Sequence, residues 1–573
     1  MSEILRDIKR IQGEKLIKFI VIATVLVALI VFLVMPLLIL FFRAFQDGPG
    51  NFVGFEQFLQ YFQSPNMRES LYNTMFISTV SMVLSVFLAT VMAYCISRKN
   101  VPGKKCFQFI SMLPIFAPTM LLGVCLIYIF GNQGLLTNVG MVVPIYGKVG
   151  IIIAETIFCF PVAFMILFIS FSSCDYRYYE AADAMGASSL KKWITITLPN
   201  IKYGLISAMF ICFTYSFTDF GAPAVVGGNY NVLATDIYKQ VIGQQNFNMG
   251  AVLGILMMVP ALVSFFVDRY ATRKQGGTIN AKSTSYVIKR QPVSDWISTG
   301  FCTVVALFMI SFFLVCLFAS LATMWPYDLQ LTWSHYNFTK VMGDGANAIL
   351  LNSLFVAVST AIVGTIVAFM AAYVVEKVTI LPRLRKGIYF LSIAPMAIPG
   401  TVVGLALVLF FNPKDFAIPF TEYVITNPVN PIYGTCLILV IANTIHYFSV
   451  PFVTASTALK KLDPEFEIVS ESLRVPFYKT FVRITLPMSM GAILEMMVYF
   501  FVNAMITVSA VVFLYTPLTK TSSISILNMR DAGDIAEAAA MSMILFAINV
   551  FVRLIYEGAR IRFLQPSRHH LPR

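Results

Sequence analysis

Ionisable side chains are rare in the apolar stretches of this sequence, and the few that occur there could do chemistry. Glu155, Asp219 and Glu495 are acids in or beside long apolar runs, and His446 lies in another. A charge at the centre of a bilayer costs at least about 2.5–3.5 kcal/mol, so such groups usually face a cavity or a partner. We treat these four and Asn443 as candidate pathway or gate residues. A purely structural role, hydrogen bonding between helices, remains the alternative.

Asp219 opens a distinctive segment, TDFGAPAVVGGNYNVLATDIYKQVIGQQNFNMGAV (218–252). Gly221, Pro223, Gly227 and Gly228 predict a break in a helix near its outer end. Irregular backbone at that depth is tolerated only inside protein or beside a wet cavity. We therefore expect the Asp219 carboxylate to reach an aqueous vestibule, where it could meet a metal ion, an ammonium group or a basic side chain of a protein partner.

Motifs for enzyme chemistry are missing from the sequence. It contains no G-x-x-x-x-G-K-[ST] phosphate loop, no G-x-S-x-G and no H-E-x-x-H. The nine Cys residues are scattered without a C-x-x-C pair, and the four His residues are dispersed. We expect no catalytic set, no metal centre and no cofactor bound by this chain.

The elements that position these residues are membrane spans. Hydrophobic residues make up 58% of the chain and charged residues 12%, with a mean hydropathy of +0.78, whereas soluble domains have about 25% charged residues. Apolar runs of about 20 residues, enough to cross about 30 Å of hydrocarbon, recur along the chain. The sequence predicts an all-α polytopic membrane protein with about twelve spans, near 18–43, 71–95, 107–130, 150–172, 202–226, 250–267, 297–322, 350–374, 387–411, 432–453, 488–515 and 537–556.

The net charge of +13 follows the predicted loops. With both termini in the cytoplasm, most of the 41 Lys and Arg residues fall inside, as the positive-inside rule requires. The exceptions are Arg43, Arg68, Lys148, Lys239, Lys340, Lys414, Lys520 and Arg530. The basic residues therefore set orientation and meet anionic lipid, and nucleic acid is not an expected partner. The first run (18–43) is too long for a signal-peptide core and is interpreted as a retained span.

The second half of the chain repeats the first. IAETIFCFPVAF (153–164) matches IANTIHYFSVPF (441–452), and TITLP (195–199) matches RITLP (483–487) at the same spacing. Each half has an even number of spans, so the repeats are parallel. We divide the chain into repeats 1–290 and 291–573, joined by the polar, basic linker 269–295.

A polar island lies between the fourth and fifth spans, in the loop 175–199. Asp175 is a helix N-cap candidate, Gly186 a helix stop, and Pro199 suits the start of the next span. These signals predict a short exposed helix, a bend and a second short helix. By composition alone, an ordinary amphipathic cytoplasmic loop explains them equally well.

The spacing within this island resembles the EAA signature of the permease subunits of type I ATP-binding-cassette importers. That resemblance implies the type I importer transmembrane fold, with the short helix docking as a coupling helix on a separate ATPase subunit. The residues that match the signature are Glu180, Ala181, Ala182, Gly186, Leu198 and Pro199. It further implies two copies of the ATPase, which hold ATP and Mg²⁺, an extracytoplasmic solute-binding protein, and a place in the inner membrane.

The second copy of the signature, in the loop 463–487, is degenerate. Residues at the matching positions include Ile468, Ser470, Arg474 and Pro487, so the Glu and the Gly are lost. We expect a coupling helix with altered contacts. Whether Glu467 or Glu471 replaces the missing acid is open.

The segment 218–252 also resembles the external gate of fused two-repeat permeases for ferric iron and for 2-aminoethylphosphonate. Within it, the residues YNVLATDIYKQVIGQQNF favour the phosphonate branch. The expected function is therefore an importer permease for one of these substrates. The alternative is an ion-coupled secondary transporter with twelve spans, which would have no need of a docking loop in each half.

Overall fold

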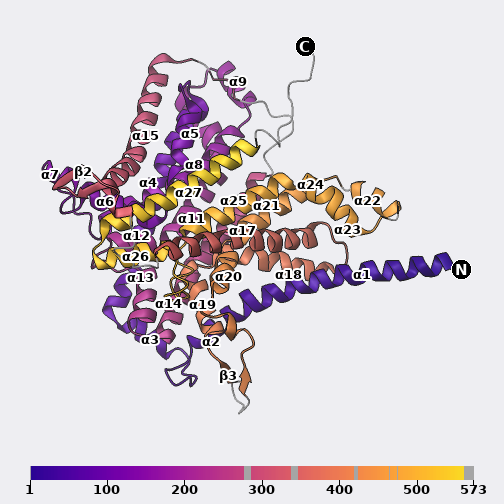
Figure 1. Ribbon diagram of the computed structural model, residues 1–573. Coiled ribbons are helices and arrows are strands. Elements are labelled where there is room, and N and C mark those ends of the chain that lie inside the picture. The colour runs from indigo at the N-terminus through magenta and orange to yellow at the C-terminus, as the bar shows by residue number, and fades with distance from the viewer. Residues whose placement is uncertain are drawn as a thin grey trace. The chain divides into compact units, whose positions relative to one another are not determined.

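A computed structural model describes residues 2–276, 286–288, 290–336, 346–417, 424–463, 465–473 and 475–560. Within these ranges, nine helices are long and apolar enough to cross a membrane, or twelve spans are present if each of three bent helix pairs counts as one. The fold class predicted from the sequence is thus confirmed (Figure 1).

The three bent pairs all lie in the second repeat. They are Pro382–Ala397 with Gly400–Phe411, bent by 114°, Cys436–His446 with Ser449–Lys460, bent by 57°, and Phe477–Met488 with Met490–Ile506, bent by 72°. The predicted span 488–515 therefore ends early, at Ile506, and the residues that follow it form turns before the next helix.

The chain forms two compact units, and these are not its two halves. One unit contains residues 1–52, 347–524 and 547–573, and the other contains 53–346 and 525–546. We call them the second-repeat unit and the first-repeat unit, after the repeat that supplies most of each. The division at 290/291 remains a prediction about the sequence repeat.

Each repeat gives its first span to the unit of the other repeat. In the second-repeat unit, α1 (Ser2–Leu29) packs on α18 (Pro382–Ile393), and α2 (Met35–Arg43) on α19 (Gly400–Phe411). In the first-repeat unit, α15 (Pro292–Leu321) packs on α4, α5 and α6.

The first-repeat unit is built from long helices and short connecting ones. Besides α15, its elements are α3 (Glu56–Gln63), α4 (Pro65–Arg98), α5 (Lys104–Met112), η2 (Leu113–Phe116), α6 (Thr119–Phe130), α7 (Leu135–Asn138), α8 (Lys148–Ser172), α9 (Arg177–Ala184), α10 (Ser189–Lys192), η3 (Trp193–Thr197), α11 (Leu198–Thr218), α12 (Gly221–Val226), α13 (Leu233–Tyr238), η4 (Lys239–Gly243), α14 (Phe247–Gly276), the hairpin β1 (Ala322–Met324) and β2 (Asp328–Leu331), and η5 (Ser334–Tyr336).

The second-repeat unit has a matching order. Besides the helices already named, its elements are η1 (Ile30–Val34), α17 (Ala346–Glu376), η7 (Ala394–Ala397), the hairpin β3 (Asp415–Ala417) and β4 (Val424–Thr426), η8 (Asn430–Ile432), α20 (Cys436–His446), α21 (Ser449–Lys460), α22 (Glu465–Ser472), α23 (Phe477–Thr480), η9 (Phe481–Thr485), α24 (Leu486–Met488) and α25 (Met490–Ile506). The division between the units runs through α26 (Ser522–Ala532) and α27 (Ile535–Ala559).

Small hydroxyl residues hold α4 against α8, the helix that carries Glu155. Ser81 and Ser85 are fully buried, and Ser85 donates to the Thr156 carbonyl at 3.1 Å as well as to its own helix. Small side chains let helices approach closely where both are apolar. α11 then packs on α4, α8 and α14, which brings its outer end beside α8.

Candidate functional site

The loop between α8 and α11 has the local structure that its sequence predicts. The Asp175 carboxylate accepts a hydrogen bond from the Arg177 N–H at 3.1 Å where α9 begins. Gly186 ends the turn after α9 with φ +68°, a conformation that suits glycine. The Ser188 hydroxyl then caps α10 by accepting from the Lys191 N–H at 3.3 Å.

The second short helix is not separate, in contrast to the prediction. α10 runs through the π-helical turn η3 into α11, and Ser189–Thr218 counts as one span. An ion pair between Asp183 and Lys192 links α9 to α10 across the bend.

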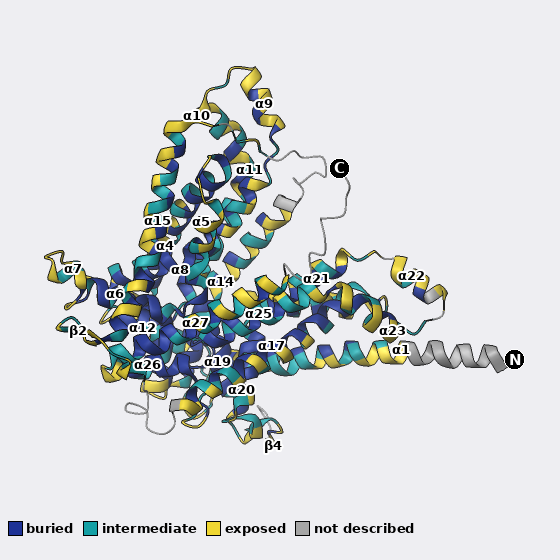
Figure 2. Ribbon diagram, turned by 45° about the horizontal axis from the view of Figure 1, so that its top comes forward, coloured by how far each residue is buried: buried dark blue, intermediate teal, exposed yellow. Residues whose placement is uncertain are grey.

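The α9 helix presents one face to its own unit and the other to solvent. Tyr179 and Ala182 are buried, and the Tyr179 hydroxyl is hydrogen-bonded to Thr197 at 2.8 Å. Glu180 and Ala181 are exposed, and Figure 2 shows exposed residues of α9 in yellow. Several large apolar residues on this loop are also exposed, among them Met185 at 79% and Leu190 at 69%. Leu198 and Pro199 lie on the exposed side where α11 begins.

A buried arginine supports the loop from behind, which sequence reasoning missed. Arg98, at the end of α4, donates to the Phe171 carbonyl at 2.9 Å. Its guanidinium lies 3.9 Å from the ring centroid of Tyr286 and 5.1 Å from that of Tyr179, within cation–π range. Burial raises the pKa of the Tyr179 and Tyr286 hydroxyls. From the sequence, Arg98 is predicted only to be one of the basic residues that set orientation.

The loop of the second repeat is held by different contacts. Ser470, at the position of Ala182, is buried and hydrogen-bonded to Thr480. Glu467 forms an ion pair with Lys377 at 3.2 Å, and the Lys377 side chain is only 7% exposed. The Glu467 carboxylate thus ties α22 to the end of α17, and its coupling role stays a prediction. Ile468 and Pro487 are exposed, and Arg474 lies outside the described residues.

Glu155 and Asp219 come together in the first-repeat unit. Glu155 is fully buried in α8, and neither of its carboxylate oxygens has a hydrogen-bond partner in the part of the chain that the structure describes. Asp219 is half-buried and directly follows α11. It is the acid whose negative charge interacts with the Glu155 carboxyl group. Thr119 borders Asp219, and Ser216 borders Glu155.

The predicted break in the fifth span is present, but it is displaced towards Asp219. α11 ends at Thr218, and the Asp219 carboxylate accepts from the Ala222 N–H at 2.8 Å to open α12. Pro223 lies inside α12, while Gly228 follows it with φ +56°. A Cβ atom on Gly221 would lie 2.0 Å from the Thr119 Oγ1, so glycine is needed there.

The corresponding region of the second repeat carries no acid. Asn443 and His446 lie in α20, and the Asn443 Oδ1 and His446 Nδ1 atoms are buried without a hydrogen-bond partner among the residues that the structure describes. A Cβ atom on Gly400 would lie 2.4 Å from the Ser509 Oγ and 3.1 Å from the His446 ring. Tyr447 is hydrogen-bonded to Thr507, the counterpart of Asp219.

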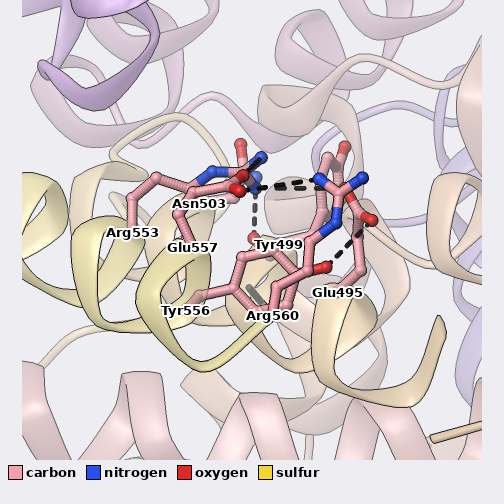
Figure 3. Close-up of polar contacts among 7 residues, drawn as sticks. All are labelled: Glu495, Tyr499, Asn503, Arg553, Tyr556, Glu557 and Arg560. Carbon is pink, nitrogen blue, oxygen red and sulfur yellow. Dashed lines mark hydrogen bonds and ion pairs between the residues drawn. The ribbon is translucent and has the colours of Figure 1, made fainter. Parts of the chain in front are cut away.

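Glu495 lies apart from this region, in a polar cluster between α25 and α27 (Figure 3). Tyr556 donates to the Glu495 carboxylate at 3.2 Å, and Arg553 forms an ion pair with it at 3.9 Å. Arg553 also pairs with Glu557 at 2.8 Å. These partners give Glu495 a structural explanation, and its pathway role remains a prediction.

The repeated spans and the two exposed loops define a multi-pass membrane transport permease. The chain belongs to the family of binding-protein-dependent transport system inner membrane components, whose model matches residues 81–276 and 362–560. The double match confirms the tandem repeat and the resemblance to fused importer permeases, and it makes the chain an inner membrane protein.

Relatives that are similar over most of the chain include two ferric transport permeases. The ferric transport system permease protein FbpB of Actinobacillus pleuropneumoniae is 27% identical over 96% of this chain and 79% of its own length. The Fe(3+)-transport system permease protein FbpB 2 of Haemophilus influenzae is 23% identical over 87% of this chain and 92% of its own. A crystal structure of a bacterial alginate ABC transporter with its periplasmic protein matches 47% of this chain and 97% of its own, at 20% identity and a TM-score of 0.40.

Proposed function

We propose that this permease forms the translocation pathway of an importer for ferric iron. The observation that carries the proposal is the similarity to the FbpB permeases over nearly the whole chain. The acid pair Glu155 and Asp219 agrees with a cationic substrate, because uncompensated carboxylates attract cations and repel a phosphonate. Neither of the two relatives named above is a phosphonate permease, so 2-aminoethylphosphonate becomes the second candidate.

We further propose that separate ATPase subunits drive transport by docking on the two coupling loops. Contiguous exposed apolar patches mark protein contact sites. Both loops expose several large apolar residues close together in the chain, including Met185 and Leu190 in the first and Ile468 and Leu473 in the second. ATP and Mg²⁺ then belong to those subunits. A solute-binding protein delivers the substrate on the opposite side, and both termini of the chain are cytoplasmic.

Uptake of radioactive iron tests the substrate. A strain that lacks this permease should lose uptake of ⁵⁵Fe(III) and regain it with the plasmid-borne gene, while growth on 2-aminoethylphosphonate as phosphorus source should not depend on the gene. The reverse pattern would favour the phosphonate branch.

Energy coupling tests the alternative of an ion-driven transporter. ATP trapped inside proteoliposomes that contain the permease with its ATPase and binding protein should drive uptake, and vanadate should stop it. Uptake that follows an imposed ion gradient without ATP would favour the secondary transporter.

A further inference from the structure

We propose that Glu155, Asp219, Thr119 and Ser216 form a binding site for one hard metal cation inside the first-repeat unit. The inference deepens the proposed function, on which it rests, by placing a transient station for the transported ion. It assigns the buried carboxylate of Glu155 as an ion ligand, a role that helix packing does not supply.

Glu155 is the residue that demands an explanation. It is fully buried, and among the described residues neither of its carboxylate oxygens has a hydrogen-bond partner. An unpaired buried charge is strongly destabilising, so native proteins pair it, protonate it or give it a metal. The charged group that acts on Glu155 is Asp219, a second acid, which raises the cost rather than lowering it.

The surrounding atoms supply oxygen donors. Ser216, two residues before the end of α11, is buried, and its hydroxyl has no hydrogen-bond partner among the described residues. The Thr119 hydroxyl approaches Asp219 because the missing Cβ of Gly221 leaves room for it. Two carboxylates and two hydroxyls are hard oxygen ligands, which hard cations prefer to soft ligands such as thiolates.

The two acids differ in exposure, which sets the order in which an ion would meet them. Asp219 is half-buried at the break between α11 and α12, whereas Glu155 lies fully buried behind it. An ion could therefore exchange water for the Asp219 oxygens first and reach Glu155 second.

The donor set fits an ion in passage more than a resident metal. Among the described residues, no three His, Cys, Asp or Glu side chains are grouped as metal ligands. A cation at this site would keep part of its water shell, and a station in a pathway must release what it binds. The second repeat has Asn443 and Thr507 at the positions of the two acids, so we expect one site per chain.

Terbium(III), a hard and redox-inert trivalent ion, is a suitable probe. The purified full-length chain, in nanodiscs of zwitterionic lipid, is equilibrated with terbium and separated by gel filtration, and bound metal is counted by mass spectrometry. We expect one ion per chain, and at least tenfold weaker binding in Glu155→Gln and in Asp219→Asn. Asp268→Asn is the matched control, because it removes another partly buried acid of the same unit, and it should bind like the wild type.

Stoichiometric binding that survives Glu155→Gln, or no binding to the wild type above empty nanodiscs, would overturn the site. Equal weakening in Asp268→Asn would also overturn it, because only bulk charge would then matter. Thermal unfolding of each variant shows whether it is folded, and the milder Ser216→Ala, expected to weaken binding by a smaller factor, supports the assignment if Glu155→Gln unfolds. Iron uptake without terbium binding removes the site and leaves the proposed function. Terbium binding without iron uptake would support the site and contradict the proposed function.

Discussion

The Tyr556 hydroxyl donates a hydrogen bond to the Glu495 carboxylate at 3.2 Å and so links α27 to α25. The spacing that aligns Glu155 with Asn443 also aligns Ser207 with Glu495 and Asp268 with Tyr556. Ser207, in α11, is hydrogen-bonded to Asp268, in α14. Both repeats therefore join their fifth and sixth spans by a hydroxyl–carboxylate bond, with the acid on opposite helices.

Glu495 is therefore expected to stabilise the fold rather than to contact substrate. Glu495→Gln retains an acceptor for the Tyr556 hydroxyl and should leave iron uptake near the wild-type level. Glu495→Ala removes the acceptor and should cost about 1 kcal/mol, which thermal unfolding in detergent would detect. A loss of uptake in Glu495→Gln at unchanged stability would instead support a pathway role.

Gly186 is needed for its backbone conformation and not for space. Apart from its chain neighbours, no atom of the described residues lies within 4 Å of where its Cβ would be, but φ is +68°. Gly186→Asn, which tolerates this region, should retain most of the transport activity. Gly186→Val should lose it, since the left-handed conformation costs about 1–2 kcal/mol for ordinary residues. Co-purification of the ATPase with each variant is the measurement. If the Asn and Val variants retained the ATPase equally well, the coupling geometry would be contradicted.

Gly221 lies against the side chain of Thr119, so a glycine meets a larger residue. In the second repeat the sizes are exchanged, because Ser509 stands at the position of Gly221 and Gly400 at that of Thr119. Gly221→Ser should destabilise the protein by about 1–3 kcal/mol through overpacking. Adding Thr119→Gly should recover part of that loss, as a double-mutant cycle of unfolding temperatures would show. Strict additivity of the two changes would mean that the residues do not meet.

The two coupling loops should respond differently to the loss of an acid. Glu467→Ala leaves the buried Lys377 charge without its partner. The free energy of unfolding should therefore fall by an amount between about 1 kcal/mol, typical of an exposed ion pair, and about 3–5 kcal/mol, typical of a buried one. Glu180→Ala, on an exposed position, should leave stability unchanged and lower ATPase binding. Lys377→Met in the Glu467→Ala background should restore stability. Equal destabilisation by both Ala variants would refute this difference.

The linker residue Tyr286 should support the first loop through its ring. Tyr286→Phe keeps the face that meets the Arg98 guanidinium and should transport normally. Tyr286→Ala should reduce ATPase co-purification several-fold, because the cation–π contact is worth about 0.5–2 kcal/mol. Normal co-purification by the Ala variant would remove the linker from the coupling site.

Much of this protein could be predicted from the sequence because the relevant signals are local. Apolar length identifies spans one at a time, and the repeat is visible by direct comparison of its halves. The turn at Gly186 and the cap at Asp175 follow from the chemistry of single residues and their neighbours in the chain. The structure has these features as expected.

Tertiary packing alone decided which spans and side chains meet. Apolar helices resemble one another in sequence, so nothing local indicates that α2 packs on α19 or that α15 joins the first-repeat unit. The juxtaposition of Glu155 with Asp219 depends on α11 ending at Thr218 beside α8, and the pairing of Glu467 depends on where α17 ends. Such contacts join residues far apart in the chain, and only the packed helices bring them together.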